Sequence, residues 1–138
     1  MNKNIINFNK KDYEISIKSE MEVLPILQKF FNVDTIIRID EVYSIFDYKG
    51  DNKYIELKTR FNSYNKYPTT MIGLNKFEYA SINKEDIYFV FKYIDGIYYY
   101  KYDKNDKFEI KNGGRCDRGR FEYKQYVFIP IEKLSKII

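Results

Sequence analysis

The chain has 138 residues, with 24 Lys and Arg against 20 Asp and Glu, and a formal net charge of +4. It contains no histidine and a single cysteine, Cys116. These absences exclude Ser-His-Asp and Cys-His catalysis, His-ligated zinc, an internal disulfide and a thiolate metal cluster. Any catalysis must therefore use Asp, Glu, Lys, Arg, Tyr, Ser or Thr side chains, and a hard metal ion is the expected cofactor.

The length and the 44% hydrophobic content indicate one domain, 1–138, built around a real core. Residues 1–7 lack the apolar stretch of a secretory signal, and no run approaches the roughly 18 apolar residues of a membrane span. We therefore expect a soluble, cytoplasmic protein with no membrane partner, located inside the host cell if it is viral. The bias toward Lys, Asn, Ile, Tyr and Phe is typical of a low-GC genome.

The first third of the chain predicts one helix. Residues 2–16 show no clear pattern, and 13–17 fit a short strand or arm. Over 19–32, apolar residues recur at three- and four-residue spacing, at Val23, Leu24, Leu27, Phe30 and Phe31. Ser19 can cap this helix, with Glu22 completing an S-x-x-E capping box. Pro25 lies inside the pattern, so the helix either kinks there or starts later.

The rest of the chain predicts strands mixed with helices. Runs of β-branched and aromatic residues predict strands, and Asp-Gly between two such runs is the strongest short hairpin signal. In chain order we expect strands over 42–48 and 54–60 around a turn at 49–53, a loop over 61–70, a helix over 76–82 introduced by Asn75, strands over 87–94 and 97–102 around Asp95-Gly96, strands over 108–110 and 126–129 around a Gly- and Arg-rich loop at 112–120, and a short helix over 131–138. This order favours one sheet with helices packed on it, α/β or α+β.

Positive charge is concentrated in two segments, 49–66 and 111–124. Each segment carries five basic and two acidic residues, so each is +3, and the remainder of the chain is −2. Three of the five arginines lie in the second segment. A polyanion is the natural partner of such a pattern, although two solvated loops would also explain it.

The strand predicted over 54–60 brings a carboxylate and an ammonium group together. Because side chains alternate between the faces of a strand, Ile55 and Leu57 point into the core and Glu56 and Lys58 share the other face. A glutamate and a lysine on a solvated strand face would be the alternative interpretation.

The preceding strand can place a second carboxylate beside Glu56. If Asp51-Asn52 is a two-residue turn, Gly50 pairs with Lys53 and Asp47 lies opposite Glu56. Cross-strand partners have Cβ atoms about 4.5–5.5 Å apart, and two carboxylates at that distance repel unless a cation lies between them. Mg²⁺ prefers such oxygen ligands. A one-residue slip of register would put Asp47 on the other face.

The pattern Asp47-x8-Glu56-x-Lys58 on a strand pair, after a helix that carries a glutamate, resembles the PD-(D/E)xK nuclease superfamily. These restriction-endonuclease-like enzymes include junction resolvases and many phage nucleases. The resemblance implies an α/β fold with a central mixed sheet flanked by helices, and hydrolysis of phosphodiester bonds in DNA with Mg²⁺ (or Mn²⁺). It implies that Asp47 and Glu56 bind the metal and that Lys58 orients or deprotonates water or stabilises developing charge.

The resemblance also implies a catalytic, metal-binding carboxylate from the first helix. Glu20 is the better match because it lies three and four residues before the apolar positions 23 and 24, and Glu22 is the alternate. Phe46 stands where the family name has proline. Two further Glu-x-Lys triplets begin at Glu109 and Glu122. Glu56 has an Asp on an adjacent predicted strand, apolar neighbours on both sides, a glutamate-bearing helix upstream and a helix downstream, and neither of the other triplets has all four features.

Basic residues outside this constellation are candidates for contacts with DNA. Arg60 shares the face of Lys58, and Lys76 begins the second helix, where backbone N–H groups favour anions, although it could equally be an ordinary surface lysine. The tyrosine-rich loop 61–70 could stack on unpaired bases. The expected nucleic-acid-binding residues are Arg60, Lys66, Lys76, Arg115, Arg118 and Arg120.

Two other functions remain open at this point: a catalytically inactive nucleic-acid-binding protein of the same fold, and a viral interaction protein that uses its tyrosine-rich strands. Tyr98 and Tyr100 share one strand face, which is either a dimer surface or core packing. By analogy with junction resolvases and nicking enzymes of this size, which use two active sites, we expect a homodimer.

Overall fold

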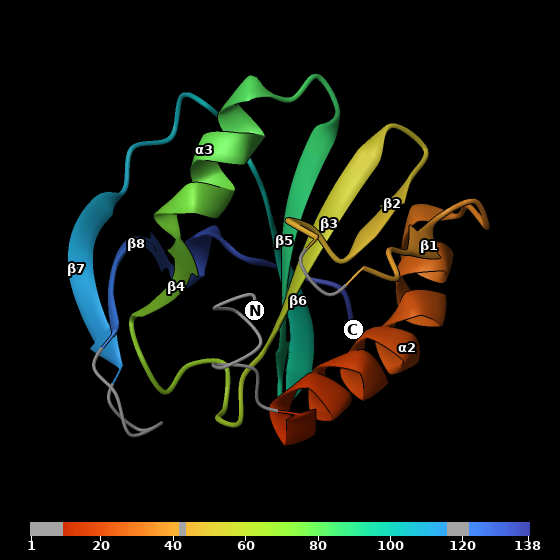
Figure 1. Cartoon of the computed structure of the whole chain (residues 1–138), viewed down its shortest axis with the longest axis horizontal. Helices are drawn as coiled ribbons and strands as arrows, with labels where there is room; N and C mark the ends of the chain where they lie inside the picture. The colour runs from red at the N-terminus through yellow and green to blue at the C-terminus, as the bar shows by residue number, and fades with distance from the viewer. Residues whose placement is uncertain (1–9, 42–43, 116–121) are drawn as a thin grey trace, which may run out of the picture.

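The computed structural model describes residues 10–41, 44–115 and 122–138, without the side chains of 114–123. This part of the chain forms a six-stranded mixed sheet, a three-stranded antiparallel sheet and two α-helices (Figure 1). The elements are α2 (Lys10–Phe31), β1 (Ile37–Arg38), β2 (Tyr48–Gly50), β3 (Lys53–Thr59), β4 (Thr69–Gly73), α3 (Leu74–Ile82), β5 (Asp86–Tyr93), β6 (Gly96–Lys101), β7 (Glu109–Arg115), β8 (Glu122–Pro130) and β9 (Ser135–Lys136). The fold is α/β, as the sequence predicts.

The large sheet has the strand order β1-β2-β3-β5-β6-β9. Its central pair, β3 and β5, is parallel, and the other pairs are antiparallel. Parallel neighbours cannot be joined by a tight turn, so the chain between them must cross a face of the sheet. That crossover contains β4 and α3, and it carries α3 over the sheet (Figure 1).

The strand β5 is buried on both faces and separates two apolar clusters. Phe89 and Phe91 belong to the cluster beneath α3, β4 and β8, and Tyr88 and Val90 belong to the cluster beneath α2. Both faces of such a strand are buried, so its sequence is a continuous run of apolar and aromatic residues, as residues 87–91 are. The two helices therefore cover opposite faces, and Glu56 and Lys58 lie on the face that α3 covers.

The small sheet has the order β4-β8-β7 and lies on the same side as α3. Its residues Ile72, Val127 and Ile129 are buried in the cluster that contains Phe89. The sequence analysis expected one sheet and missed β4, which begins where the predicted loop 61–70 ends. This strand gains its stability from pairing with β8, some 60 residues later, which no local pattern reveals.

The helix α2 is longer than predicted, since it begins at Lys10. The strand or arm expected over 13–17 is therefore wrong, and Ser19 is a buried residue inside the helix, not its cap. The first turns are mostly exposed and carry no apolar stripe, so periodicity could not find them. Pro25 is accommodated within the helix. In the described ranges no helix is long and apolar enough to span a membrane.

The strand predicted over 42–48 is wrong over 44–47, because β2 starts only at Tyr48, and residues 42–43 lie outside the described part of the chain. The register of the hairpin is nevertheless confirmed: Gly50 pairs with Lys53 and Tyr48 with Ile55. Asp51 and Asn52 both have positive φ, of 50° and 58°, which fits the tight turn that matches strand twist. The residue before the ladder is also bound to β3, because the N–H of Asp47 donates to the carbonyl of Ile55, the partner of Tyr48, at 2.9 Å.

The helix over 76–82 is confirmed, but it starts at Leu74 with Gly73 as its N-cap, so Asn75 lies inside it. The hairpin of β5 and β6 is confirmed as well. Its turn residues are Ile94 and Asp95, because Tyr93 pairs with Gly96.

The remaining differences lie in the C-terminal third of the chain. The strand β7 continues to Arg115, into the segment predicted as a loop over 112–120, and residues 116–121 of that loop lie outside the described part. The helix expected over 131–138 is wrong, because a short 3-10 turn at Ile131–Lys133 is followed by β9. The pairing of Tyr99 with Ser135 explains this, since a neighbouring strand edge overrides a weak local preference.

Gly50 is predicted to be intolerant of any side chain. Its φ is +148°, and a Cβ atom built there would lie 2.4 Å from the carbonyl oxygen of Thr35. Gly50→Ala should therefore lower the free energy of unfolding in urea by about 2 kcal/mol or more. Gly73→Ala is the matched control, because its Cβ would meet only the flexible side chain of Asn75. Equal stability of the two variants would contradict this account.

Candidate active site

The centre of the site is Glu56, a carboxylate that is 3% exposed in the middle of β3. It lies between β2 and β5, with Phe89 as its partner on β5. A buried charge of this kind is costly unless opposite charges compensate for it. Two ammonium groups do so: Lys58 Nζ lies 3.4 Å and Lys76 Nζ 3.3 Å from the same oxygen, Glu56 Oε2.

Asp47 lies beside Glu56 at the start of the neighbouring strand. Its Oδ2 accepts a hydrogen bond from the backbone N–H of Leu57 at 2.7 Å, which holds the carboxyl group over β3. Burial, the charge of Glu56 and a hydrogen-bonding contact with the Glu56 carboxyl group raise the pKa of Asp47 to about 9, and Glu20 adds to this. Carboxyl groups this close need a proton or a cation between them.

Glu20 reaches the same place from α2. Its Oε1 accepts a hydrogen bond from Arg38 Nε at 2.9 Å, and its backbone carbonyl accepts one from the Tyr48 hydroxyl at 2.6 Å. Burial raises the pKa of Glu20, against the lowering effect of Arg38, and its side chain is in hydrogen-bonding contact with Asp47. The alternate, Glu22, is exposed and instead pairs with Lys92 at 3.1 Å.

The two lysines at Glu56 are held differently. Lys76 comes from the first turn of α3 and also donates a hydrogen bond to the carbonyl of Ile45, and its side chain is 18% exposed. Lys58 is 37% exposed and makes only the Glu56 contact among those the structure records. Lys58 is thus the more accessible of the two ammonium groups, and Lys76 is held by the larger number of recorded contacts.

The donor set fits a hard divalent cation. Mg²⁺ takes oxygen ligands, keeps several of its waters and is usually held by one or two carboxylates, which Asp47 and Glu56 supply with Glu20 adjoining them. Within 10–41, 44–115 and 122–138, no group of three or more His, Cys, Asp or Glu residues is arranged so that it could hold a metal ion. The fit therefore rests on the carboxylate pair and its crowding of negative charge.

The expected DNA-binding residues on β3 and in the loop after it are placed differently from one another. Arg60 donates to the carbonyl of Met71 at 2.7 Å and is partly buried, and burial lowers its pKa. This hydrogen bond links the end of β3 to β4, so the recorded contact of Arg60 is a structural one. Lys66 is exposed in the loop between these strands, with its ammonium group 5.4 Å from the ring centroid of Tyr67.

The arginines expected to contact DNA in the second basic segment are only partly covered. Arg115 ends β7, and its backbone pairs with Glu122 on β8. Arg118 and Arg120 lie outside the described residues. Nothing in the described geometry brings this segment to the carboxylates.

Tyr98 and Tyr100, which the sequence analysis assigned either to a dimer surface or to core packing, are mainly packed against other residues. Tyr98 stacks on Tyr64 with ring centroids 4.0 Å apart, and Tyr100 is 4% exposed in the core. The stack also removes Tyr64 from the set of residues that could hold an unpaired base. Phe61 and Tyr67, which are 78% and 54% exposed, are the aromatic side chains of that loop with free surface.

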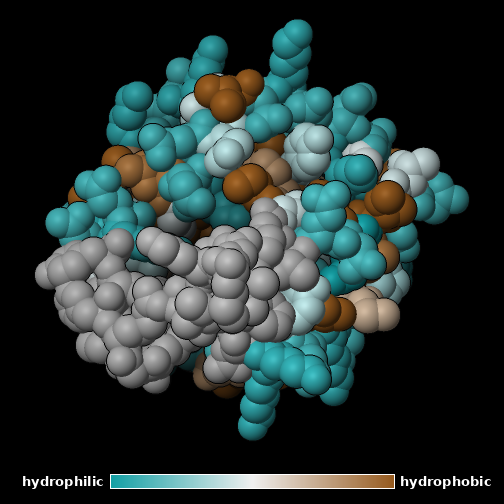
Figure 2. Space-filling model, in the orientation of Figure 1, coloured by the Kyte–Doolittle hydropathy of each residue, from teal (hydrophilic) through white to brown (hydrophobic). Residues whose placement is uncertain are grey.

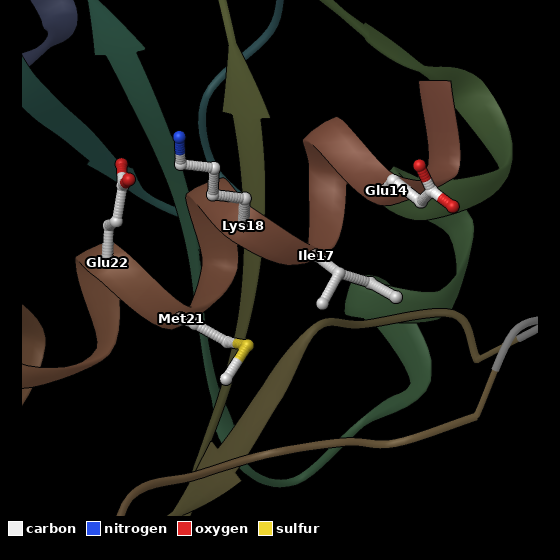
Figure 3. A pocket seen from close by; sticks show the side chains of 5 residues that line it. All are labelled: Glu14, Ile17, Lys18, Met21 and Glu22. Atoms are coloured by element: carbon white, nitrogen blue, oxygen red, sulfur yellow. The ribbon is translucent and has the colours of Figure 1, made fainter. Parts of the chain in front are cut away.

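Two pockets of the described chain are lined by residues other than Glu20, Asp47, Glu56 and Lys58. A pocket of about 460 Å³ along α2 is lined by Glu14, Ile17, Lys18, Met21 and Glu22, and Ile17 and Met21 project from the same side of the helix (Figure 3). A second, of about 340 Å³, lies at the turn between β2 and β3. Hydrophobic side chains are scattered among hydrophilic ones on the face in Figure 2.

Three features of the site were missed by the sequence analysis. Arg38 pairs with Glu20, the Tyr48 hydroxyl holds the backbone of α2, and Lys76 sits on Glu56 instead of facing solvent. The scarcity of arginine was a usable signal for Arg38, since few of the basic residues are arginine. Lys76 lies twenty residues after Glu56, and only the crossover between parallel strands brings them together.

No curated protein and no solved structure matches the chain significantly. A family model described as "Phage putative PDDEXK endonuclease" matches residues 9–137, which is nearly the whole chain. The matched range includes Glu20, Asp47, Glu56 and Lys58. The chain therefore belongs to this PDDEXK family.

Proposed function

We propose that this protein is a Mg²⁺- or Mn²⁺-dependent endonuclease that hydrolyses phosphodiester bonds in DNA. The observation that carries the proposal is the buried Asp47–Glu56 carboxylate pair with the accessible ammonium group of Lys58 on the same face. Family membership supports nuclease activity in general. The choice of metal, of DNA and of these residues belongs to the proposal.

In this mechanism Asp47 and Glu56 would hold the metal ion, and Glu20 would support them from α2. A bound divalent cation would polarise the phosphodiester and lower the pKa of a coordinated water. The Leu57 N–H fixes the orientation of the Asp47 carboxylate, and Arg38 fixes that of Glu20. Holding the ligands in place before the substrate arrives reduces the reorganisation that the reaction requires.

Lys58 acts on the substrate side. Its ammonium group is held 3.4 Å from Glu56 Oε2, which leaves N–H donors free for a water molecule or a phosphate oxygen. A positive charge at this position either orients the attacking water or stabilises the charge that develops on the phosphate. Either role requires the side chain to be accessible, as its 37% exposure allows.

The activity is tested with supercoiled plasmid, linear duplex, branched and single-stranded DNA, each with Mg²⁺, Mn²⁺ or EDTA. The proposal expects metal-dependent nicks or breaks that EDTA abolishes. Glu56→Gln should remove the activity, because it removes the central charge of the site. Salt-sensitive DNA binding without cleavage of any substrate would instead favour a catalytically inactive binding protein.

The role of Glu20 has a matched control two residues away. Glu20→Gln should lower cleavage about 10- to 100-fold, because it weakens the support of Asp47. Glu22→Gln changes the same helix by the same chemistry but touches only Lys92, so it should leave cleavage unchanged. Equal loss in both variants would show that α2 contributes stability only, and thermal denaturation of both variants would show this directly.

The homodimer, DNA as the partner and the cytoplasm of a host cell as the location are parts of the same proposal. Cleavage of both strands of a duplex or a branched substrate would use two copies of the site. Sedimentation at micromolar concentration, with and without DNA, should then show a dimer. A monomer under both conditions would contradict the dimer and leave a nicking activity to be tested on its own.

A further inference from the structure

We infer that the site is built for a single divalent cation, and that the ammonium group of Lys76 occupies the position a second cation would take. This inference rests on the proposed function and specifies its metal requirement. It starts from the contacts of Glu56, whose Oε2 atom is approached by both Lys58 Nζ and Lys76 Nζ.

A carboxylate that bridges two metal ions needs a free oxygen for each of them. In two-metal sites the ions lie about 3.5–4 Å apart and clamp the attacking and the leaving oxygens. Here Glu56 faces the Asp47 carboxyl group on one side and two ammonium groups on the other. Both recorded ammonium contacts of Glu56 are made to Oε2, whereas the neighbouring carboxyl group of Asp47 adds negative charge to the site.

The ammonium group of Lys76 lies between oxygen ligands. Its ammonium group bridges the Glu56 carboxylate and the carbonyl of Ile45, which are the kinds of ligand that hard cations use. Two acceptors hold the group in this place, and its side chain is mostly buried. Lys58, by contrast, has one recorded acceptor and is twice as exposed, so it is free to move toward a substrate.

The fold explains why this ammonium group stays in place. Lys76 belongs to the first turn of α3, and the next residue, Phe77, stacks on Phe89 of β5 with ring centroids 5.1 Å apart. Phe89 is the β5 partner of Glu56. The stack thus anchors α3 to the strand beside Glu56, and the helix presents Lys76 to the carboxylate whether or not a metal ion is bound.

The inference is tested by counting bound Mn²⁺ ions in the absence of DNA. Electron paramagnetic resonance of free Mn²⁺, checked by calorimetry, should give one ion per chain for the wild type. Lys76→Ala removes the ammonium group and frees the Glu56 and Ile45 oxygens, so it should bind two ions per chain. Lys76→Arg keeps the charge and should bind one.

Lys58→Ala is the positional control, because it removes the other cation from the same oxygen but leaves the Ile45 carbonyl occupied. It should bind one ion. A second control, Lys84→Gln, removes an exposed positive charge just after α3 and should also leave one ion. Thermal denaturation without metal verifies that each variant is folded. If Lys76→Ala does not fold, the number of Mn²⁺ ions bound per wild-type chain still tests the inference.

The outcomes separate the inference from the proposed function. Two ions bound to the wild type, or one ion bound to a folded Lys76→Ala variant, would overturn the single-ion assignment while leaving a metal-dependent nuclease intact. No Mn²⁺ bound to the wild type would overturn both.

Discussion

Replacing Asp47 with asparagine is expected to abolish metal-dependent cleavage and, at the same time, to stabilise the metal-free protein. The carboxyl group of Asp47 is buried against Glu56 and Glu20, which raises its pKa to about 9. Asparagine keeps an oxygen that can accept the Leu57 N–H but removes the repulsion. The free energy of unfolding without metal should rise by about 1 kcal/mol or more.

The sign of the pH dependence follows from the direction of this shift. The folded protein binds a proton at Asp47 that the unfolded chain releases above pH 4, so the metal-free wild type should lose stability as pH rises from about 4 to about 9. Asp47→Asn lacks this group, and its stability advantage should widen toward pH 9. Urea denaturation in EDTA at several pH values measures this directly.

Metal addition gives the converse result. Mg²⁺ or Mn²⁺ should raise the melting temperature of the wild type, because it binds the folded state and relieves the crowded carboxylates, and should do so little or not at all for Asp47→Asn. A variant that is less stable than the wild type in EDTA, or that still cleaves DNA at the wild-type rate, would show that Asp47 is a structural residue.

Replacing Lys58 with methionine is expected to reduce the rate of cleavage about 100-fold or more while leaving Mn²⁺ binding in place. The ammonium group lies on the substrate side of Glu56 and is the more accessible of the two lysines there. Losing a group that moves a proton or stabilises transition-state charge costs about 10²- to 10⁴-fold in rate. Because the side chain is partly exposed, the folded protein should keep its melting temperature within a few degrees.

A matched control for Lys58 exists in the same chain. Glu109 and Lys111 repeat the Glu-x-Lys triplet on β7, where their side chains are 64% and 53% exposed and 3.2 Å apart. Lys111→Met should leave the cleavage rate unchanged. Loss of rate in both variants alike, or a Lys58→Met variant that cleaves normally at saturating metal, would contradict the role given to Lys58.

Much of the site follows from short-range rules. The alternation of side chains along 54–60 put Glu56 and Lys58 on one face, and the Asp51-Asn52 turn set a register that the structure confirms. These two rules need only the residues within about ten positions of each other. They were enough to place Asp47 beside Glu56, even though the strand expected to contain Asp47 begins in the structure only at Tyr48.

Errors arose where an element has no local signature of its own. The early turns of α2 are exposed on nearly all sides, so no apolar period marks them, and the capping box at Ser19 was a coincidence of composition. The strands β1 and β9 are two residues long each and exist because a neighbouring strand offers hydrogen bonds. Edge strands of this length lie below what periodicity can resolve.

The division between sequence and tertiary structure is clearest at the lysines. The missing histidine, the oxygen-rich candidate ligands and the Glu-x-Lys pattern on a strand are properties of the sequence alone, and they determined the chemistry that is available. Which cations surround Glu56 was decided only by the fold, because the parallel pairing of β3 and β5 forces a crossover that brings α3, and with it Lys76, onto the buried carboxylate. Contacts between residues brought together by such a crossover depend on packing across a sheet face, which no local pattern encodes.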